Sequence, residues 1–314
     1  MKIVFLEPLG ISKELLSEKV NSRLNKNNEI IYYDNRVTDT ETLIERSKDA
    51  DIVVLSNFPY RREVIENCPK LKAICVAFTG VDHVDMDYCR ERNITVCNCA
   101  GYSTVAVADV VFAMAINLAR NIVKCDEKCR QGGTKDGLVG FELEGKSFGV
   151  IGCGAIGSRV ANIAKAFGCN VYAYNRSPKA MEGITFTDME TLLKTCDIVS
   201  LHVPQNSATI NLIGEHELSL MKKSAILINT ARGPVVNEDA LTQALKNHEI
   251  AAAGIDVFDK EPPLDTEKEL LKLDNVLVTP HIAFATQQAF EKRADIVAEN
   301  LKSIINGTPQ NVIK

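Results

Sequence analysis

A glycine-rich turn between a strand pattern and a helix pattern constrains this chain more than any other feature. The segment Phe148–Gly157 reads FGVIGCGAIG and carries the spacing G-x-G-x-x-G. Apolar residues at helical spacing follow it, at Val160, Ala161, Ile163, Ala164 and Phe167. A second strand pattern covers residues 170–174. This order predicts a βαβ unit whose turn holds the pyrophosphate of a dinucleotide.

Each glycine of the turn has a separate physical reason. Gly152 permits a tight turn, Gly154 lets the backbone approach a phosphate, and Gly157 lets the helix pack closely on the strand. The helix would begin at Ala155 and Ile156, where free N–H groups and the helix dipole favour an anion. We therefore expect these five residues to bind a dinucleotide cofactor.

Length and composition restrict the class of protein. The 314 residues suggest two domains, and 46% hydrophobic with 25% charged residues is typical of a soluble globular chain. The formal net charge is −5 with no basic stripe, which argues against a nucleic-acid partner. No apolar run approaches the roughly 18 residues of a membrane span, so we expect no membrane partner and a cytoplasmic location.

Ten cysteines are expected to be reduced and buried. Cys97-x-Cys99 and Cys125-x-x-x-Cys129 lack the paired spacings of a zinc site, so we expect no metal. Cys153 lies inside the glycine turn. It is either a thiol sensitive to reagents near the cofactor or a small loop residue, and we favour the second.

Strand patterns alternate with helix patterns in two successive series, which predicts an α/β protein with two doubly wound parallel sheets and a cleft between them. We expect a flavodoxin-like substrate domain from residues 1–101 with 284–314, and a Rossmann dinucleotide-binding domain from residues 102–283. The second sheet is expected to have six strands, at 147–151, 170–174, 198–202, 225–229, 251–255 and 276–279. An apolar helix at 105–118 and a last helix at about 286–306 complete the pattern.

Ligands of such sheets bind at the carboxyl ends of the strands. Arg232, Glu261 and His281 each follow an expected strand there. An imidazole can exchange a proton with a hydroxyl or carbonyl group, and a neighbouring carboxylate favours its protonated form. The planar fork of arginine suits a substrate carboxylate. The three side chains are those that hydride transfer to a 2-oxo acid needs.

Other histidines compete for this role. His216 and His248 fall in or beside helical segments and are interpreted as surface residues, while His83 is left open. His202 ends a strand, and with Val203 and Pro204 it is expected to line the cofactor site. The residue pattern alone does not decide between these histidines and His281.

Several motifs together resemble the D-isomer-specific 2-hydroxyacid dehydrogenase family. They are similar in order and spacing and cover nearly the whole chain: Phe78–Asp82, Ala100–Thr104, Gly152–Gly157, Ile228–Pro234, Gly254–Phe258 with Glu261–Pro263, and Thr279–Ile282. Within the family the chain most resembles the glycerate dehydrogenase/hydroxypyruvate reductase branch. The resemblance implies NAD(P)-dependent, reversible reduction of a small 2-oxo acid, such as hydroxypyruvate or glyoxylate, to the D-2-hydroxy acid.

The resemblance also implies individual roles. His281 would be the acid/base with Glu261 as its partner, and Arg232 would bind the substrate carboxylate and polarise the carbonyl. Backbone N–H groups around Thr79 and Gly80 would hold the same carboxylate. The remaining expected cofactor contacts are Asp256 near the nicotinamide, and Pro204, Thr230 and Ala231 along the cofactor.

The end of the second Rossmann strand bears on the choice of cofactor. NAD-type sheets usually carry Asp or Glu there for the ribose 2′-OH. This chain has Asn175, Arg176 and Ser177 instead. Because Arg176 and Ser177 suit a 2′-phosphate, we expect NADP(H) in preference to NAD(H), with the alternative that Arg176 faces solvent or stacks on the adenine.

Three further expectations stay open. The substrate is alternatively a lactate-like, branched or phosphorylated 2-hydroxy acid; Arg61 and Arg62 would then either receive a phosphate or simply start a solvated helix. A nicotinamide-sensing scaffold, like the corepressors built on this fold, is a remote alternative. A homodimer is expected because the apolar helix at 105–118 and the arm after it need burial.

Overall fold

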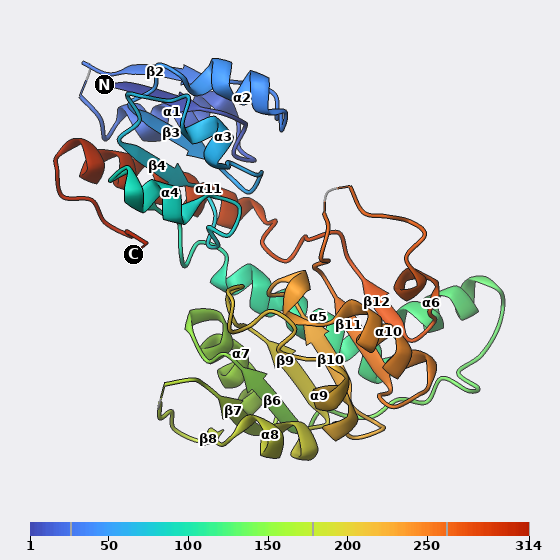
Figure 1. The fold of residues 1–314 in the computed structure, drawn as a ribbon. Helices are drawn as coiled ribbons and strands as arrows, with labels where there is room; N and C mark the ends of the chain where they lie inside the picture. Colours follow the sequence, from blue (N-terminus) through green and yellow to red (C-terminus); the bar gives the residue numbers. More distant parts are fainter. Residues whose placement is uncertain (26, 178, 262, 314) are drawn as a thin grey trace. The chain divides into compact units, whose positions relative to one another are not determined.

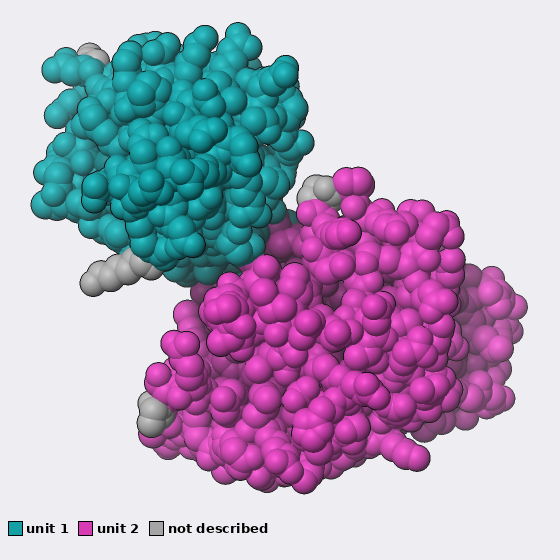
Figure 2. All heavy atoms as spheres, in the orientation of Figure 1, with its two compact units in different colours: residues 1–103, 285–314 teal, residues 104–284 magenta. Residues whose placement is uncertain are grey.

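The computed structural model describes residues 1–25, 27–177, 179–261 and 263–313. Pro262, part of one family motif, lies outside the described residues. The chain divides into two compact units, residues 1–103 with 285–314 (unit 1) and residues 104–284 (unit 2), shown in two colours in Figure 2. Each unit is a parallel sheet with helices on it, so the expected α/β fold class is confirmed.

Unit 1 contains a five-stranded parallel sheet in the order β2-β1-β3-β4-β5 (Figure 1). This is the flavodoxin-type order. The central strands β3 and β4 are buried along their whole length, as expected for a sheet covered on both faces. The strands are β1 (Lys2–Phe5), β2 (Glu29–Tyr32), β3 (Ile52–Leu55), β4 (Ala73–Val76) and β5 (Thr95–Cys97), and the helices are α1 (Lys13–Asn21), α2 (Thr40–Ser47), α3 (Arg62–Ile65), α4 (Met86–Glu91) and α11 (Gln287–Ile305).

Unit 2 contains a seven-stranded parallel sheet in the order β12-β11-β10-β9-β6-β7-β8. The expectation of six strands was wrong, because β8 pairs with β7 through two residues, too few to leave a periodic pattern. The order on either side of β6 is that of a Rossmann sheet. The strands are β6 (Ser147–Ile151), β7 (Asn170–Tyr174), β8 (Thr185–Phe186), β9 (Ile198–Leu201), β10 (Ile226–Asn229), β11 (Ala252–Ile255) and β12 (Val276–Val278).

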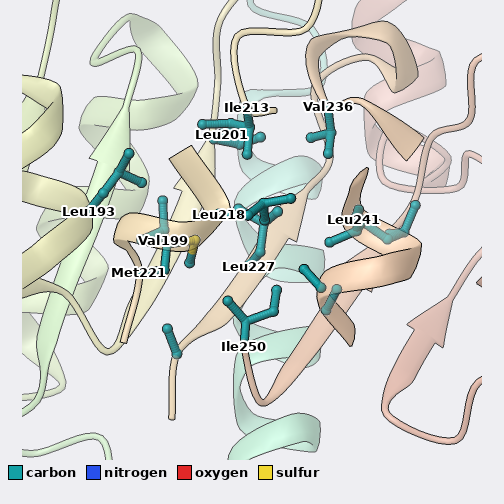
Figure 3. Close-up of a cluster of buried hydrophobic side chains, with 14 of the residues drawn as sticks. Leu193, Val199, Leu201, Ile213, Leu218, Met221, Leu227, Val236, Leu241 and Ile250 are labelled. Atoms are coloured by element: carbon teal, nitrogen blue, oxygen red, sulfur yellow. The ribbon is translucent and has the colours of Figure 1, made fainter. Parts of the chain in front are cut away.

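The helices of unit 2 cover both faces of its sheet. They are α5 (Thr104–Arg120), α6 (Ile122–Arg130), α7 (Ala155–Ala166), α8 (Met189–Thr195), α9 (Glu215–Leu220) and α10 (Glu238–Lys246), with short 3-10 turns at Gly233–Val235 and Glu269–Lys272. One apolar cluster, drawn in Figure 3, joins the sheet to α8, α9 and α10. A second cluster joins the opposite face to α5 and α7. Strand residues that point to opposite faces thus pack into two separate apolar layers. These layers hold the carboxyl ends of the strands in fixed register.

Helix α5 is the apolar segment that the sequence pattern singled out. It packs on α7, β10 and β11, and its buried side chains include Val111, Phe112 and Met114. Within the described residues, no single helix is long and apolar enough to cross a membrane; α5 and α6 reach that composition only as a pair bent by 59°. All ten cysteines are free thiols, and eight of them are buried.

Candidate active site

The glycine turn after β6 has the close contacts that its residues require. Gly152 has φ +93°, and a Cβ there would lie 2.7 Å from the carbonyl carbon of His202. A Cβ on Gly157 would lie 2.2 Å from the carbonyl oxygen of Gly152. A Cβ on Gly154 would meet no atom within 4 Å. Gly152 and Gly157 therefore let the backbone pack tightly, while the backbone of Gly154 stays accessible.

These features suit the diphosphate of a dinucleotide. Gly154 is the N-cap of α7 and supplies no side-chain cap, so the N–H groups of the first turn face the open side of the turn. Thr230, just after β10, is 8% exposed, and its Oγ1 has no hydrogen-bond partner in the described part of the structure. Buried hydroxyl groups normally have a hydrogen-bond partner, so Thr230 Oγ1 is available to bind a ligand at this turn. Ala231 follows it and is partly buried.

The segment after β7 contacts the same turn. Asn175 accepts a hydrogen bond from the Cys153 N–H at 3.1 Å and donates one to the Ser177 carbonyl at 3.1 Å, so it braces the turn. Arg176 and Ser177 are exposed. The Nζ of Lys179 donates to the Cys153 carbonyl at 2.6 Å and to Ser158 Oγ at 2.7 Å. Sequence reasoning missed Lys179, although a second cation shortly after Arg176 was the available signal.

Arg232, Glu261 and His281 follow three neighbouring strands, β10, β11 and β12, at their carboxyl ends. The Arg232 loop is held by Asn229, whose Nδ2 donates to the Arg232 carbonyl at 2.9 Å and whose Oδ1 accepts from the Ala231 N–H at 3.0 Å. Arg232 Nη1 donates to the Ala231 carbonyl at 2.8 Å. Parallel pairing thus delivers the three residues to one edge of the sheet.

The Arg232 loop packs directly on the chain that leads to Glu261. A Cβ on Gly233 would lie 2.0 Å from the carbonyl carbon of Phe258 and 2.4 Å from the Asp259 nitrogen. The Phe258 N–H in turn donates to Glu261 Oε2 at 3.3 Å. The two loops therefore form one packed layer.

The side chains of Glu261 and His281 contact each other, as the sequence pattern suggested. His281 Nδ1 lies 2.6 Å from Glu261 Oε1, and the two side chains are 20% and 19% exposed. The carboxylate thus receives Nδ1 on one oxygen and the Phe258 N–H on the other. The Phe284 ring lies edge-on to the imidazole, with centroids 5.5 Å apart. This arrangement fixes the ring orientation and favours a proton on Nδ1.

Asp256 holds the loop that carries His281. Its fully buried carboxylate accepts hydrogen bonds from Thr279 Oγ1 at 2.6 Å, the Ile282 N–H at 2.8 Å and the Ala283 N–H at 2.9 Å. Its carbonyl accepts the His281 N–H at 2.8 Å. His281 has φ +52°, a left-handed conformation that is uncommon outside glycine and is here maintained by these bonds. Burial raises the pKa of Asp256, and its hydrogen bonds oppose that rise.

His202 has a different environment from His281. Its Nε2 lies 2.9 Å from Ser200 Oγ, and burial lowers the pKa of His202 to about 3. It is therefore neutral near pH 7 and unsuited to supplying a proton. His202 and the partly buried Val203 adjoin Gly152 at the point where the strand order reverses, and Pro204 after them is exposed. His216 and His248 are exposed, and His83 is buried in unit 1.

Thr79 and Gly80 belong to unit 1, where they follow β4 and are partly exposed. Within the described residues, no group of three or more His, Cys, Asp or Glu side chains could hold a metal ion.

Comparisons with known proteins agree with this geometry. The family model for the D-isomer specific 2-hydroxyacid dehydrogenase NAD binding domain matches residues 112–283. The glyoxylate reductase of Thermococcus litoralis is 43% identical over 285 residues, 86% of each chain. The glycerate dehydrogenase of Methylorubrum extorquens is 38% identical over 282 residues, covering 87% of this chain and 88% of that protein.

A solved structure has the same fold throughout. An acyclic imino acid reductase, solved in complex with NADPH and D-Arg, superposes with a TM-score of 0.91 at 34% sequence identity and covers 100% of both chains. The strand order, the glycine turn and these likenesses have one explanation: the chain belongs to the D-isomer-specific 2-hydroxyacid dehydrogenase family and is an oxidoreductase with that family's NAD-binding Rossmann domain.

Proposed function

We propose that this enzyme reduces a small 2-oxo acid of the glyoxylate or hydroxypyruvate type to the D-2-hydroxy acid, in a reversible reaction. The observation that carries the proposal is the His281–Glu261 pair at 2.6 Å, at the carboxyl edge of a dinucleotide-binding sheet. The relatives named glyoxylate reductase and glycerate dehydrogenase support this substrate class.

The roles of the residues follow from their chemistry. A bound reduced nicotinamide supplies the hydride that reaches C2 of the oxo acid. His281 donates a proton from Nε2 to the carbonyl oxygen, while Glu261 keeps Nδ1 protonated and compensates the positive charge. Arg232 binds the substrate carboxylate and polarises the carbonyl. Thr79 and Gly80 contribute backbone N–H groups to that carboxylate.

The cofactor is proposed to lie along Gly152, Gly154, Ala155, Ile156 and Gly157. The further contacts are His202, Val203, Pro204, Thr230, Ala231, Asn175, Arg176 and Ser177. Asp256 supports the edge of the sheet near the nicotinamide through the His281 loop. The open backbone of Gly154 and the hydroxyl of Thr230, which has no partner in the described part of the structure, support this placement.

NADP(H) is proposed in preference to NAD(H). Residues 175–181, just after β7, include no carboxylate but two cations, Arg176 and Lys179. Lys179 lies against the glycine turn, where it adds positive charge beside the α7 N-terminus. An NADPH complex of a similar structure fits this preference. We expect a higher kcat/KM with NADPH, and Arg176→Asp should weaken NADPH use; a clear preference for NADH would refute the assignment.

The function is tested by a panel of 2-oxo acids with both cofactors and by His281→Ala. The variant should lose turnover while cofactor affinity, measured by fluorescence titration, changes little. Wild-type turnover in the variant would show that His281 is not the acid/base. Steady oxidation of reduced cofactor on adding 2-oxo acids would also exclude a purely nicotinamide-sensing scaffold.

Lactate-like, branched or phosphorylated substrates are outcomes of the same panel. Arg61 Nη1 donates to the Asp82 carbonyl at 3.2 Å, and Arg62 lies 3.9–4.0 Å from two glutamates. These contacts support a structural role for both arginines over phosphate binding.

We also propose that the enzyme is a homodimer and is located in the cytoplasm. Helix α6 has no buried residue, its Ile122 and Val123 are 50% and 47% exposed, and Val139 in the following arm is 81% exposed. A second copy of the chain would cover these apolar groups. Sedimentation velocity of the wild type and of Val123→Asp would test the assembly.

A further inference from the structure

Hydrogen bonds from the side chains of three asparagines connect the end of the chain, inside unit 1, to the carbonyl oxygen of Thr79. Asn98 Nδ2 donates to this oxygen at 2.6 Å. Asn300 Nδ2, on α11, donates to the backbone carbonyl oxygen of Asn98 at 2.8 Å. Asn311 Nδ2 donates to Asn300 Oδ1 at 2.8 Å. Residues from the C-terminal end of the chain thus reach the turn that follows β4.

The amide groups of Asn98 and Asn300 are buried, which is unfavourable in free energy. Asn98 is 6% exposed and Asn300 is fully buried. Removing an amide from water costs free energy that its hydrogen bonds offset only in part, and an apolar side chain of similar volume would avoid the cost. Because every named polar atom has a partner, these hydrogen bonds specify one geometry for the turn.

Three successive carbonyl oxygens of this turn are held in the same way. The Ala77 oxygen accepts from Arg293 Nη1 at 3.4 Å, the Phe78 oxygen from the Cys99 N–H at 2.9 Å, and the Thr79 oxygen from Asn98. Asn98 Oδ1 also accepts the Ala100 N–H at 3.3 Å. The backbone from Ala77 to Thr79 is therefore set by the segment after β5 and by α11.

The planar peptide bond connects this support to substrate binding. The Thr79 carbonyl and the Gly80 N–H belong to one rigid peptide unit, so a bond that fixes the oxygen also sets the direction of the N–H. We propose that Asn98 is a positioning residue that aims the Gly80 N–H at the carboxylate of the 2-oxo acid, with Asn300 holding Asn98 in place. This inference rests on the proposed function, which assigns that N–H to the substrate carboxylate.

The test compares the 2-oxo acid that the enzyme reduces fastest with its methyl ester, which lacks the carboxylate. Asn98→Leu removes the donor to Thr79 at nearly constant volume. We expect kcat/KM for the acid to fall about tenfold, through KM, as one hydrogen bond to a charged group is lost. The ester should change less than about twofold, and kcat and cofactor affinity should stay the same.

Controls separate positioning from simple destabilisation. Leu43→Ala removes a side chain that is 1% exposed in α2 of the same unit, so it should lower Tm without altering the preference for acid over ester. Asn98→Ser, a milder change, decides the question if the leucine variant does not fold, and it should also reduce the preference.

Two results would overturn the inference. In the first, both Asn98 variants keep the wild-type preference for the acid. In the second, the acid and the ester lose rate equally. Failure of the proposed function is distinguishable, because the wild-type enzyme would then reduce no 2-oxo acid. If the wild type reduces the acid and the ester equally well, carboxylate binding by the Gly80 N–H is wrong, and Asn98 has no such role.

Discussion

Replacing Glu261 by glutamine tests the central pair of the site most directly. Glu261 accepts two donors, His281 Nδ1 at 2.6 Å and the Phe258 N–H at 3.3 Å. An amide has one acceptor oxygen, so Glu261→Gln can satisfy only one of these donors. It also removes the negative charge that favours the cationic imidazole.

The size of the effect follows from the distance and the burial. Both side chains are about one-fifth exposed, so solvent screens their interaction only partly. Loss of a charge-assisted hydrogen bond in such a setting is worth about 1.5–3 kcal/mol, or roughly a 10- to 100-fold fall in kcat.

The assay is kcat for reduction at saturating 2-oxo acid and saturating reduced cofactor. Glu261→Asp keeps the negative charge, so its kcat should fall less than that of Glu261→Gln, with the remaining loss coming from the shorter side chain. Glu142→Gln, an exposed carboxylate, is the matched control and should match the wild type. If Glu261→Gln retains the wild-type kcat, the carboxylate does not assist His281.

Three other perturbations have defined outcomes. Burial lowers the pKa of His202 to about 3, so between pH 6.5 and 4.5 the unfolded state binds more protons than the folded state. The wild type should therefore lose stability as pH falls, by up to about 1.4 kcal/mol per pH unit from this group. The urea midpoint of His202→Gln should fall less steeply with pH over that range, and parallel curves for the two proteins would contradict the prediction. Gly157→Ala should lower Tm through a contact of 2.2 Å, at a cost of roughly 1–3 kcal/mol, whereas Gly154→Ala, with no atom within 4 Å, should leave Tm unchanged and weaken only cofactor binding. Asp256→Asn leaves at least one of three donors unsatisfied, so kcat should fall more than cofactor affinity, and an unchanged kcat would show that the His281 loop holds itself.

Much of the architecture could be predicted because its cause is local. Short apolar runs mark most of the strands, and the spacing of Gly152, Gly154 and Gly157 requires a turn of one kind. The two-residue strand β8 was missed because its pairing with β7 depends on tertiary contact. Helix α6 was also not predicted, and it buries none of its residues.

The site was predictable in its residue types but not in its supports. Glu261 and His281 were expected to meet because their strands are parallel neighbours. The left-handed backbone of His281, the three donors on Asp256 and the contact of Lys179 with Cys153 depend on loop paths. Loop paths result from long-range packing, which residue spacing does not encode.

The absence of a side chain at Gly233 has a practical consequence for altering the substrate range. Because the backbone of Phe258 and Asp259 occupies the space where a Cβ would stand, any larger residue at 233 displaces two loops at once. Libraries that randomise this position would mostly contain inactive members whatever substrate is screened. Insertions in either loop would need a compensating change in the other, so diversity is better introduced elsewhere in the chain.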